Sequence, residues 1–232
     1  MERLAKRFGG FRALDGITLH LHAGEVLGLV GPNGSGKTTC INVISGLYPP
    51  DGGQVTFDGQ PIGAQASHRL VRLGINRTFQ SPKPFLSLTV RENVDLAAYY
   101  GGREAPLGVD ALLASLELDR MAERPAAELN SAQQKTLDLA RAMATGPRLL
   151  LVDELAAGLN PAELARMAER LRRLAEAGLA LLVVEHLMAF IDRVTDRVVV
   201  MAAGKEIFEG TLVAATQDAE VVRVFLGGGH HG

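Results

Sequence analysis

The chain has 232 residues, and its 24 Lys and Arg side chains against 26 Asp and Glu give a formal net charge of −2. That balance argues against a nucleic-acid partner held on a basic surface, and a content of 47% hydrophobic and 22% charged residues excludes a disordered or collagen-like chain. The sequence has no run of about 18 apolar residues that would cross a bilayer and no secretory signal pattern at its start, and the single Cys40 allows no internal disulfide.

The N-terminal region has the pattern of half-buried antiparallel strands. Ile17, Leu19 and Leu21 alternate with polar residues, and residues 55–59 end on an Asp-Gly turn signal. We predict a small antiparallel β-layer beside the main core. Because little sequence precedes Phe8, part of a first strand is expected to be absent.

A phosphate-binding loop follows the first buried strand. Residues 26–30 are apolar and predict a parallel strand, residues 39–46 predict a helix, and residues 31–38 fit the P-loop (Walker A) pattern G-x-x-x-x-G-K-[ST]. In such a loop backbone N–H groups converge on phosphate, the lysine reaches the β- and γ-phosphates, and the final hydroxyl ligates Mg²⁺. The residues predicted to bind nucleotide here are Asn33, Gly34, Ser35, Gly36, Lys37, Thr38 and Thr39. Cys40 is expected to be a small buried residue of the same helix.

The middle of the chain is predicted to be helical. Residues 87–146 are interpreted as a helical lobe inserted into the core, and residues 81–84 lead into it. Thr89 is placed to cap the first helix. Ser131 and Gln134 fit a capping box, so a helix N-terminus able to present amides to an anion is expected there.

Three further apolar segments predict parallel strands, at residues 149–152, 179–184 and 197–201. The first ends in Asp153 and Glu154, which places two carboxylates at the carboxyl edge of the sheet, where α/β folds build their sites. Asp153 suits a hold on Mg²⁺, and Glu154 is placed to polarise an attacking water. Alternation of strands and helices predicts an α/β fold with a parallel sheet.

The remaining segments complete the predicted organisation. Asn160, Pro161 and Glu163 fit a helix start. The core is assigned to residues 1–86 and 147–226, and the low-complexity residues 227–232 to a flexible tail.

The order of these motifs resembles that of the nucleotide-binding subunits of ATP-binding cassette (ABC) transporters, over essentially the whole chain. The matching segments are Arg77-Thr78-Phe79-Gln80 (the Q-loop), Leu129-Asn130-Ser131-Ala132-Gln133 (in place of the LSGGQ signature), Asp153-Glu154, Ala157-Gly158-Leu159-Asn160 (the D-loop) and Glu185-His186 (the switch histidine). Residues 73–80, 155–161 and 184–188 look like the cassettes of importers of branched-chain amino acids and related amides or urea. Phe8 lies where such cassettes place an aromatic ring that stacks on adenine, and Phe11 is a competing candidate.

The resemblance implies the ABC ATPase fold, a P-loop NTPase core with a mixed sheet, an antiparallel β-layer and an inserted helical lobe. It implies ATP hydrolysis coupled to solute uptake, with ATP and Mg²⁺ as cofactors. Glu154 would act as general base, His186 would hold the γ-phosphate or orient water, and Gln80 would link Mg²⁺ and water to the lobe. The implied Mg²⁺ ligands are Thr38, Gln80 and Asp153, and the residues implied to face the nucleotide of a second subunit are Asn130, Ser131, Ala132 and Gln133.

The resemblance also implies partners. A second cassette, identical or different, would close over the nucleotides, and transmembrane permease subunits would dock near Gln80 and the following residues as far as Asn93. A solute-binding protein would act indirectly, and the chain would lie on the cytoplasmic face of the inner membrane as a peripheral subunit.

Three departures from the family pattern bear on these expectations. Ala132 adds a Cβ where the signature has glycine, which is expected to weaken that half-site. Leu155 replaces the usual proline after the Asp-Glu pair and is expected to loosen the turn, and Asn160 replaces the usual D-loop aspartate.

Two alternatives stay open. One is an ABC ATPase outside transport, although such proteins usually carry coiled-coil insertions or a second cassette. The other is a regulatory module that binds nucleotide with weak turnover because of its altered signature. Small-molecule kinases and GTPases are disfavoured, because the signature-like helix, the Asp-Glu strand and His186 have no reason to occur together in those enzymes.

Overall fold

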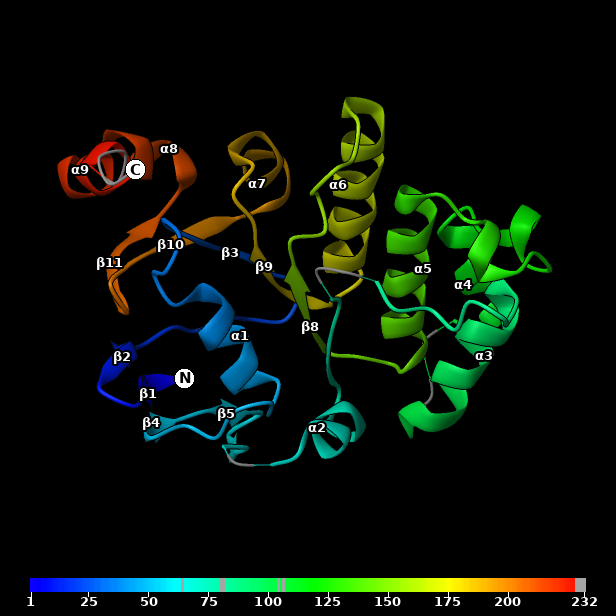
Figure 1. The fold of residues 1–232 in the computed structure, drawn as a ribbon, viewed down its shortest axis with the longest axis horizontal. Helices are drawn as coiled ribbons and strands as arrows, with labels where there is room; N and C mark the ends of the chain where they lie inside the picture. Colours follow the sequence, from blue (N-terminus) through cyan, green and yellow to red (C-terminus); the bar gives the residue numbers. More distant parts are fainter. Residues whose placement is uncertain (64, 80–81, 104, 106, 228–232) are drawn as a thin grey trace.

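The computed structural model describes residues 1–63, 65–79, 82–103, 105 and 107–227. Its centre is a six-stranded sheet in the order β11-β10-β3-β9-β8-β7 (Figure 1). All neighbouring pairs are parallel except β10 with β11. The strands are β3 (Val26–Val30), β7 (Ile75–Arg77), β8 (Leu149–Asp153), β9 (Ala180–Val184), β10 (Arg197–Ala202) and β11 (Lys205–Gly210). The four predicted core strands are confirmed to within one residue at each end.

A separate antiparallel layer lies beside this sheet, as predicted. Its order is β2-β1-β4, from β1 (Glu2–Phe8), β2 (Phe11–Ile17) and β4 (Gly52–Gln54), and a hairpin of β5 (Thr56–Phe57) and β6 (Gln60–Pro61) follows. The expected strand through Leu19 and Leu21 is wrong, because β2 ends at Ile17. Leu19 instead turns into the core, where it is buried and its N–H donates to the carbonyl of Met1 at 3.0 Å.

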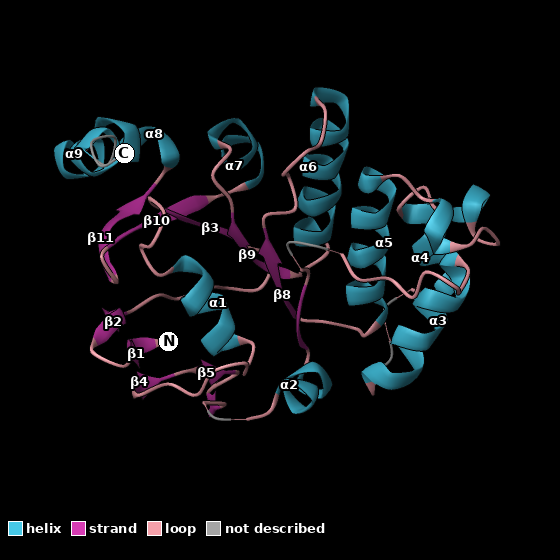
Figure 2. Cartoon of the chain, viewed as in Figure 1, coloured by secondary structure: helices cyan, strands magenta, loops and turns pink. Residues whose placement is uncertain are grey.

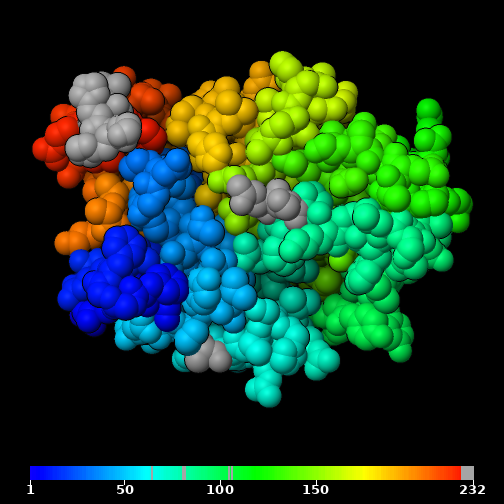
Figure 3. All heavy atoms as spheres, in the orientation of Figure 1, coloured from blue at the N-terminus to red at the C-terminus, as the bar shows by residue number. Residues whose placement is uncertain are grey.

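In its described residues, the predicted helical stretch between residues 87 and 146 contains three α-helices and two 3₁₀ turns. These are α3 (Val90–Gly101), α4 (Val109–Ser115), η1 (Asp119–Met121), η2 (Ala126–Glu128) and α5 (Ser131–Ala144). Thr89 caps α3 as predicted, through a reciprocal capping box with Glu92. The space-filling view shows this lobe and the β-layer at opposite ends of the molecule (Figure 3).

The other helices cover the two faces of the sheet (Figure 2). They are α1 (Lys37–Ile44), α2 (Ser67–Leu73), α6 (Pro161–Glu176), α7 (Met188–Val194), α8 (Leu212–Gln217) and α9 (Ala219–Gly227). Helix α9 thus includes the first residue of the predicted tail, and residues 228–232 of that tail lie outside the described part of the chain. Among the described residues, every helix is too short or too polar to cross a membrane.

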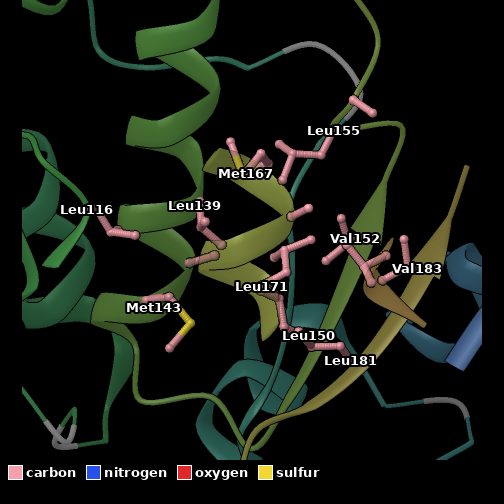
Figure 4. Packing of buried hydrophobic residues seen from close by; sticks show 14 of the residues in the cluster. Leu116, Leu139, Met143, Leu150, Val152, Leu155, Met167, Leu171, Leu181 and Val183 are labelled. Carbon is pink, nitrogen blue, oxygen red and sulfur yellow. The ribbon is translucent and has the colours of Figure 1, made fainter. Parts of the chain in front are cut away.

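The parallel strands are apolar throughout because both of their faces are buried. Leu150, Val152, Leu181 and Val183 face one cluster, which α5 and α6 complete, whereas Leu151 and its neighbours on the other face join α1 and the β-layer. In Figure 4 side chains of α6, including Leu171, lie between those strand residues and the side chains of α5. The lobe therefore packs on the core through continuous apolar contact.

Candidate nucleotide site

The phosphate loop connects β3, in the middle of the sheet, to α1, which begins at Lys37 rather than at the predicted Thr39. Two of its glycines are required by space and by backbone conformation. A Cβ on Gly31 would lie 2.2 Å from the carbonyl oxygen of Met201, and one on Gly36 (φ +106°) would lie 2.4 Å from that of Ala13. Only glycine fits such positions, so the loop turns tightly into the helix N-terminus, a favourable place for an anion.

The Lys37 ammonium lies on the inside of this loop. It donates to the carbonyls of Gly31 at 2.9 Å and Pro32 at 3.0 Å, and it lies 3.4 Å from the Ser35 hydroxyl. Burial lowers the pKa of Lys37, and the nearby carboxylates of Glu154 and Asp153 oppose that shift. The positive charge inside the loop thus interacts with two acidic side chains.

The rest of the predicted loop leaves room for a ligand. Asn33, Gly34 and Thr38 are exposed, and Thr39 is half-buried. Cys40 is buried, as predicted, and burial raises the pKa of its thiol to about 12. Nucleotide phosphates would therefore meet backbone amides and hydroxyls here, and the thiol does not contribute.

Asp153 lies at the carboxyl end of β8 and is held by Arg77 of β7. Its Oδ2 accepts from Arg77 Nη2 at 3.1 Å, and Arg77 Nη1 donates to Asn42 Oδ1 of α1 at 2.8 Å. Burial raises the pKa of Asp153, and the charge of Arg77 opposes this. The Arg77 bridge fixes Asp153 relative to α1. In the sequence Arg77 belongs only to the Q-loop segment, because nothing local connects it to a carboxylate far along the chain.

Glu154 and His186 meet where β8 and β9 end. His186 Nδ1 lies 3.6 Å from Glu154 Oε1, with about half of the histidine side chain exposed. Glu154 has a left-handed backbone (φ +49°), and its N–H donates to the carbonyl of Val184 at 3.0 Å. The pairing of Asp153 with Val184 explains the meeting, since it aligns the residues that follow each strand. The structure thus brings the predicted acid and histidine together at the predicted edge.

The turn after Glu154 is held by side chains from outside it, although Leu155 stands where the family pattern has proline. Leu155 is 1% exposed, and its carbonyl accepts from Lys135 Nζ of α5 at 2.9 Å. The N–H of Ala156 donates to the buried carboxylate of Glu185 at 2.6 Å. Lys135 was not among the residues predicted for the site, and its signal in the sequence is a charge on the apolar face of α5.

The start of α5 differs by one residue from the prediction. Asn130, with extended backbone, is the N-cap and forms a reciprocal capping box with Gln133, whereas Ser131 and Gln134 were predicted to form it. An asparagine side chain caps as well as a serine. As a result Ser131 is already helical and exposed, with Ala132 half-buried beside it. These residues lie in the lobe, on the far side of β8 from α1 (Figure 1).

The remaining predicted residues are placed as follows. Asn160 caps α6 with Glu163, as predicted. Phe8 is 42% exposed and meets Tyr48 edge to face at 5.2 Å, and Phe11 beside it is 63% exposed. Gln80 lies outside the described residues.

The site's oxygen donors fit Mg²⁺, which prefers hydroxyl, carboxylate and phosphate oxygens together with water. The exposed Thr38 hydroxyl lies at the start of α1, and the Asp153 carboxylate ends β8. Thr38 follows Lys37 in the chain, and the Asp153 carboxylate opposes the lowering of the Lys37 pKa.

Comparison with known proteins gives concordant matches. A family model described as ABC transporter matches residues 14–157. The chain is 38% identical to a probable branched-chain amino acid transport ATP-binding protein, LivG, of Archaeoglobus fulgidus, covering 97% of this chain and 94% of that protein. It is 33% identical to the high-affinity branched-chain amino acid transport ATP-binding protein BraF of Pseudomonas aeruginosa, covering 97% and 95%.

Two solved structures extend the comparison. One is an ATP-binding cassette of an ABC transporter in its ADP conformation, with a TM-score of 0.88, 32% identity and 97% of both chains covered. The other is a dimeric cassette in a post-hydrolysis state bound to ADP and Pi, with a TM-score of 0.79, 27% identity, and 91% of this chain and 97% of that chain covered.

Proposed function

This chain belongs to the ABC transporter family, and on that premise we propose that it is the ATP-hydrolysing subunit of an importer of branched-chain amino acids or a related amino acid or amide. One observation carries the proposal. The phosphate loop, Asp153 and Glu154 after β8, and His186 after β9 come from three different parts of the sequence and converge at one edge of the sheet. The names of the relatives support the class of solute.

ATP binding follows from the geometry of the loop. The backbone amides of residues 33–39 and the N-terminus of α1 would hold the phosphates, with Lys37 at the β- and γ-phosphates. Phe8, exposed on the β-layer, would stack on adenine. Mg²⁺, held by Thr38, Asp153 and Gln80, would neutralise charge on the β- and γ-phosphate oxygens.

Hydrolysis would use Glu154 and His186. A carboxylate at the end of β8, before a turn that is hydrogen-bonded to Lys135 and Glu185, is suited to accept a proton from an attacking water. His186, near enough to interact with Glu154, would orient that water or contact the γ-phosphate. Gln80 would connect this site to the lobe.

A second cassette would complete the site. The exposed N-terminus of α5, with Asn130, Ser131, Ala132 and Gln133, would face the γ-phosphate bound to the partner and offer amides and a hydroxyl to it. The similarity to a dimeric cassette supports this arrangement. Residues 87–146 would move with the partner as a lobe of their own, relative to the core of residues 1–86 and 147–226.

Permease subunits would dock beside the lobe. A groove of about 390 Å³ lies between α2 and β7 on one side and α3 and α5 on the other, and Phe79, Tyr100, Arg72 and Arg141 are among its lining residues. Asn93 would not contact a permease, because it is fully buried and donates to the carbonyls of Phe85 and Thr89. This docking would hold the chain at the cytoplasmic face of the membrane, beneath permeases that receive solute from a binding protein.

The test is Glu154→Gln in the full chain, assembled with its membrane subunits in proteoliposomes. We expect leucine uptake and phosphate release to fall together by about 10²- to 10⁴-fold, the contribution of a general base, while ATP still binds. Glu169→Gln removes the same charge from an exposed position of α6 and should retain activity within about twofold. A Glu154→Gln variant that hydrolyses as fast as the wild type would contradict the assignment.

A further inference from the structure

Lys135, in the second turn of α5, is 5% exposed even though it carries a charge. Its ammonium donates to the carbonyl of Leu155 at 2.9 Å and to that of Ala157, and the carbonyl of Glu154 lies at 3.5 Å. An ammonium has three donors. All three are thus directed at a single turn of backbone, the one that follows Glu154.

Glu185 holds the same turn from the amide side. It is 1% exposed, and its Oε1 accepts from the N–H of Ala156 at 2.6 Å. Burial lowers the pKa of Lys135 and raises that of Glu185, and the charge of each opposes the shift of the other. A buried cation and a buried anion therefore enclose residues 154–157. Such groups are costly to bury unless they are paired and hydrogen-bonded.

No proline ring restrains this turn. The family pattern has proline after the Asp-Glu pair, whose ring would fix φ, whereas Leu155 has no such ring. Leu155 packs in the apolar cluster near Met167 of α6 (Figure 4), and its carbonyl is held by Lys135. The conformation of the turn, including the left-handed Glu154 that begins it, is thus set by contacts from α5 and β9.

We propose that Lys135 is a positioning residue for ATP hydrolysis, which fixes the turn that carries Glu154 without touching the nucleotide. The inference rests on the proposed role of Glu154. Placement of a catalytic group matters steeply, since a displacement of about 1 Å can cost roughly 10²-fold in rate. Loss of the ammonium would free the carbonyls of Leu155 and Ala157 and allow the carboxylate to shift.

The test compares Lys135→Met, which keeps the shape and removes the donors, with Lys135→Gln, which keeps an amide donor. Both are made in the full chain with its membrane subunits. Phosphate release at saturating Mg-ATP gives kcat, and a fluorescent ATP analogue gives Kd and the number of binding-competent sites. Thermal unfolding is followed in parallel.

For Lys135→Met we expect a 10- to 100-fold lower kcat per binding-competent site, with Kd within about threefold of wild type. Lys135→Gln should fall between the two. Arg172→Met is the matched control, because Arg172 also donates to a backbone carbonyl, that of Val194. It contacts Asp196, which precedes β10 and so lies at the amino-terminal end of that strand, away from the nucleotide site. Its kcat should stay within about twofold of wild type, whatever its stability.

The outcomes separate the two proposals. If the wild-type transporter releases no phosphate, the proposed function itself fails. If the wild type is active and Lys135→Met matches its kcat per binding site, the positioning role is overturned. A loss of activity that only follows the loss of binding sites would also overturn it, because it would reflect folding alone. If Lys135→Met does not fold, the kcat per binding site of Lys135→Gln is compared with that of the wild type instead. Equal values would overturn the positioning role.

Discussion

At the start of α5, two adjacent side chains are expected to have different roles: Asn130 caps the helix, and Ser131 is proposed to contact nucleotide. Asn130 accepts from the N–H of Gln133 at 2.9 Å, and the Gln133 side chain accepts from the N–H of Asn130 at 3.0 Å. Asn130→Ala removes the first bond and leaves a helix amide without its cap, which costs about 1 kcal/mol, in a range of roughly 0.5–2. For a chain of this size, that loss lowers the melting temperature by about 2–4 °C.

Ser131→Ala should behave in the opposite way. Ser131 is exposed and already helical, so its free energy of unfolding should stay within about 0.5 kcal/mol of wild type. Its hydroxyl is nevertheless proposed to contact the γ-phosphate on the second cassette, and phosphate release in the assembled transporter should therefore fall. Asn130→Ser, which keeps a capping oxygen, should restore most of the stability.

Urea unfolding and phosphate release on the same preparations measure the two effects. If Ser131→Ala destabilises the chain as much as Asn130→Ala does, the capping register is wrong. If Ser131→Ala leaves both stability and phosphate release unchanged, the proposed contact across the dimer is wrong.

Two further predictions concern the adenine and a buried acid. Phe8→Ala should weaken ATP binding by about 1–3 kcal/mol, the usual contribution of base stacking. Phe11→Ala removes the neighbouring exposed ring and should leave the Kd for ATP within about twofold of wild type. Equal effects of the two variants in a nucleotide titration would refute the choice of Phe8. Burial raises the pKa of Asp138 above its ordinary value, although the hydrogen bond from the Phe79 amide and the charge of Arg141 lower it. The protonated carboxyl therefore stabilises the fold below about pH 4, and this contribution is lost as pH rises through the folded-state pKa. The asparagine of Asp138→Asn does not titrate, so only the wild type loses this contribution. The free energy of unfolding of the variant, measured in urea, should therefore increase relative to that of the wild type from about pH 4 to pH 7, and a difference that stays constant with pH would contradict the raised pKa.

Much of the fold could be predicted because its signals are local. The strands predicted at residues 26–30 and 149–152 are short apolar runs next to turn residues, and burial on both faces favours such a composition. The caps at Thr89 and Asn160 likewise involve groups only three residues apart. At Asn130, two adjacent residues could both cap, and the sequence alone could not choose the register.

The sequence by itself determined which groups could do the chemistry: a glycine-rich loop with Lys37, and carboxylates at the end of an apolar strand. Only the tertiary structure decided how those groups are held. The bond from Arg77 to Asp153 and the bonds from Lys135 to the turn after Glu154 join elements distant in the chain. The physical reason is that a charged side chain becomes buried only when another element covers it and supplies its partners, and that depends on packing rather than on neighbouring residues.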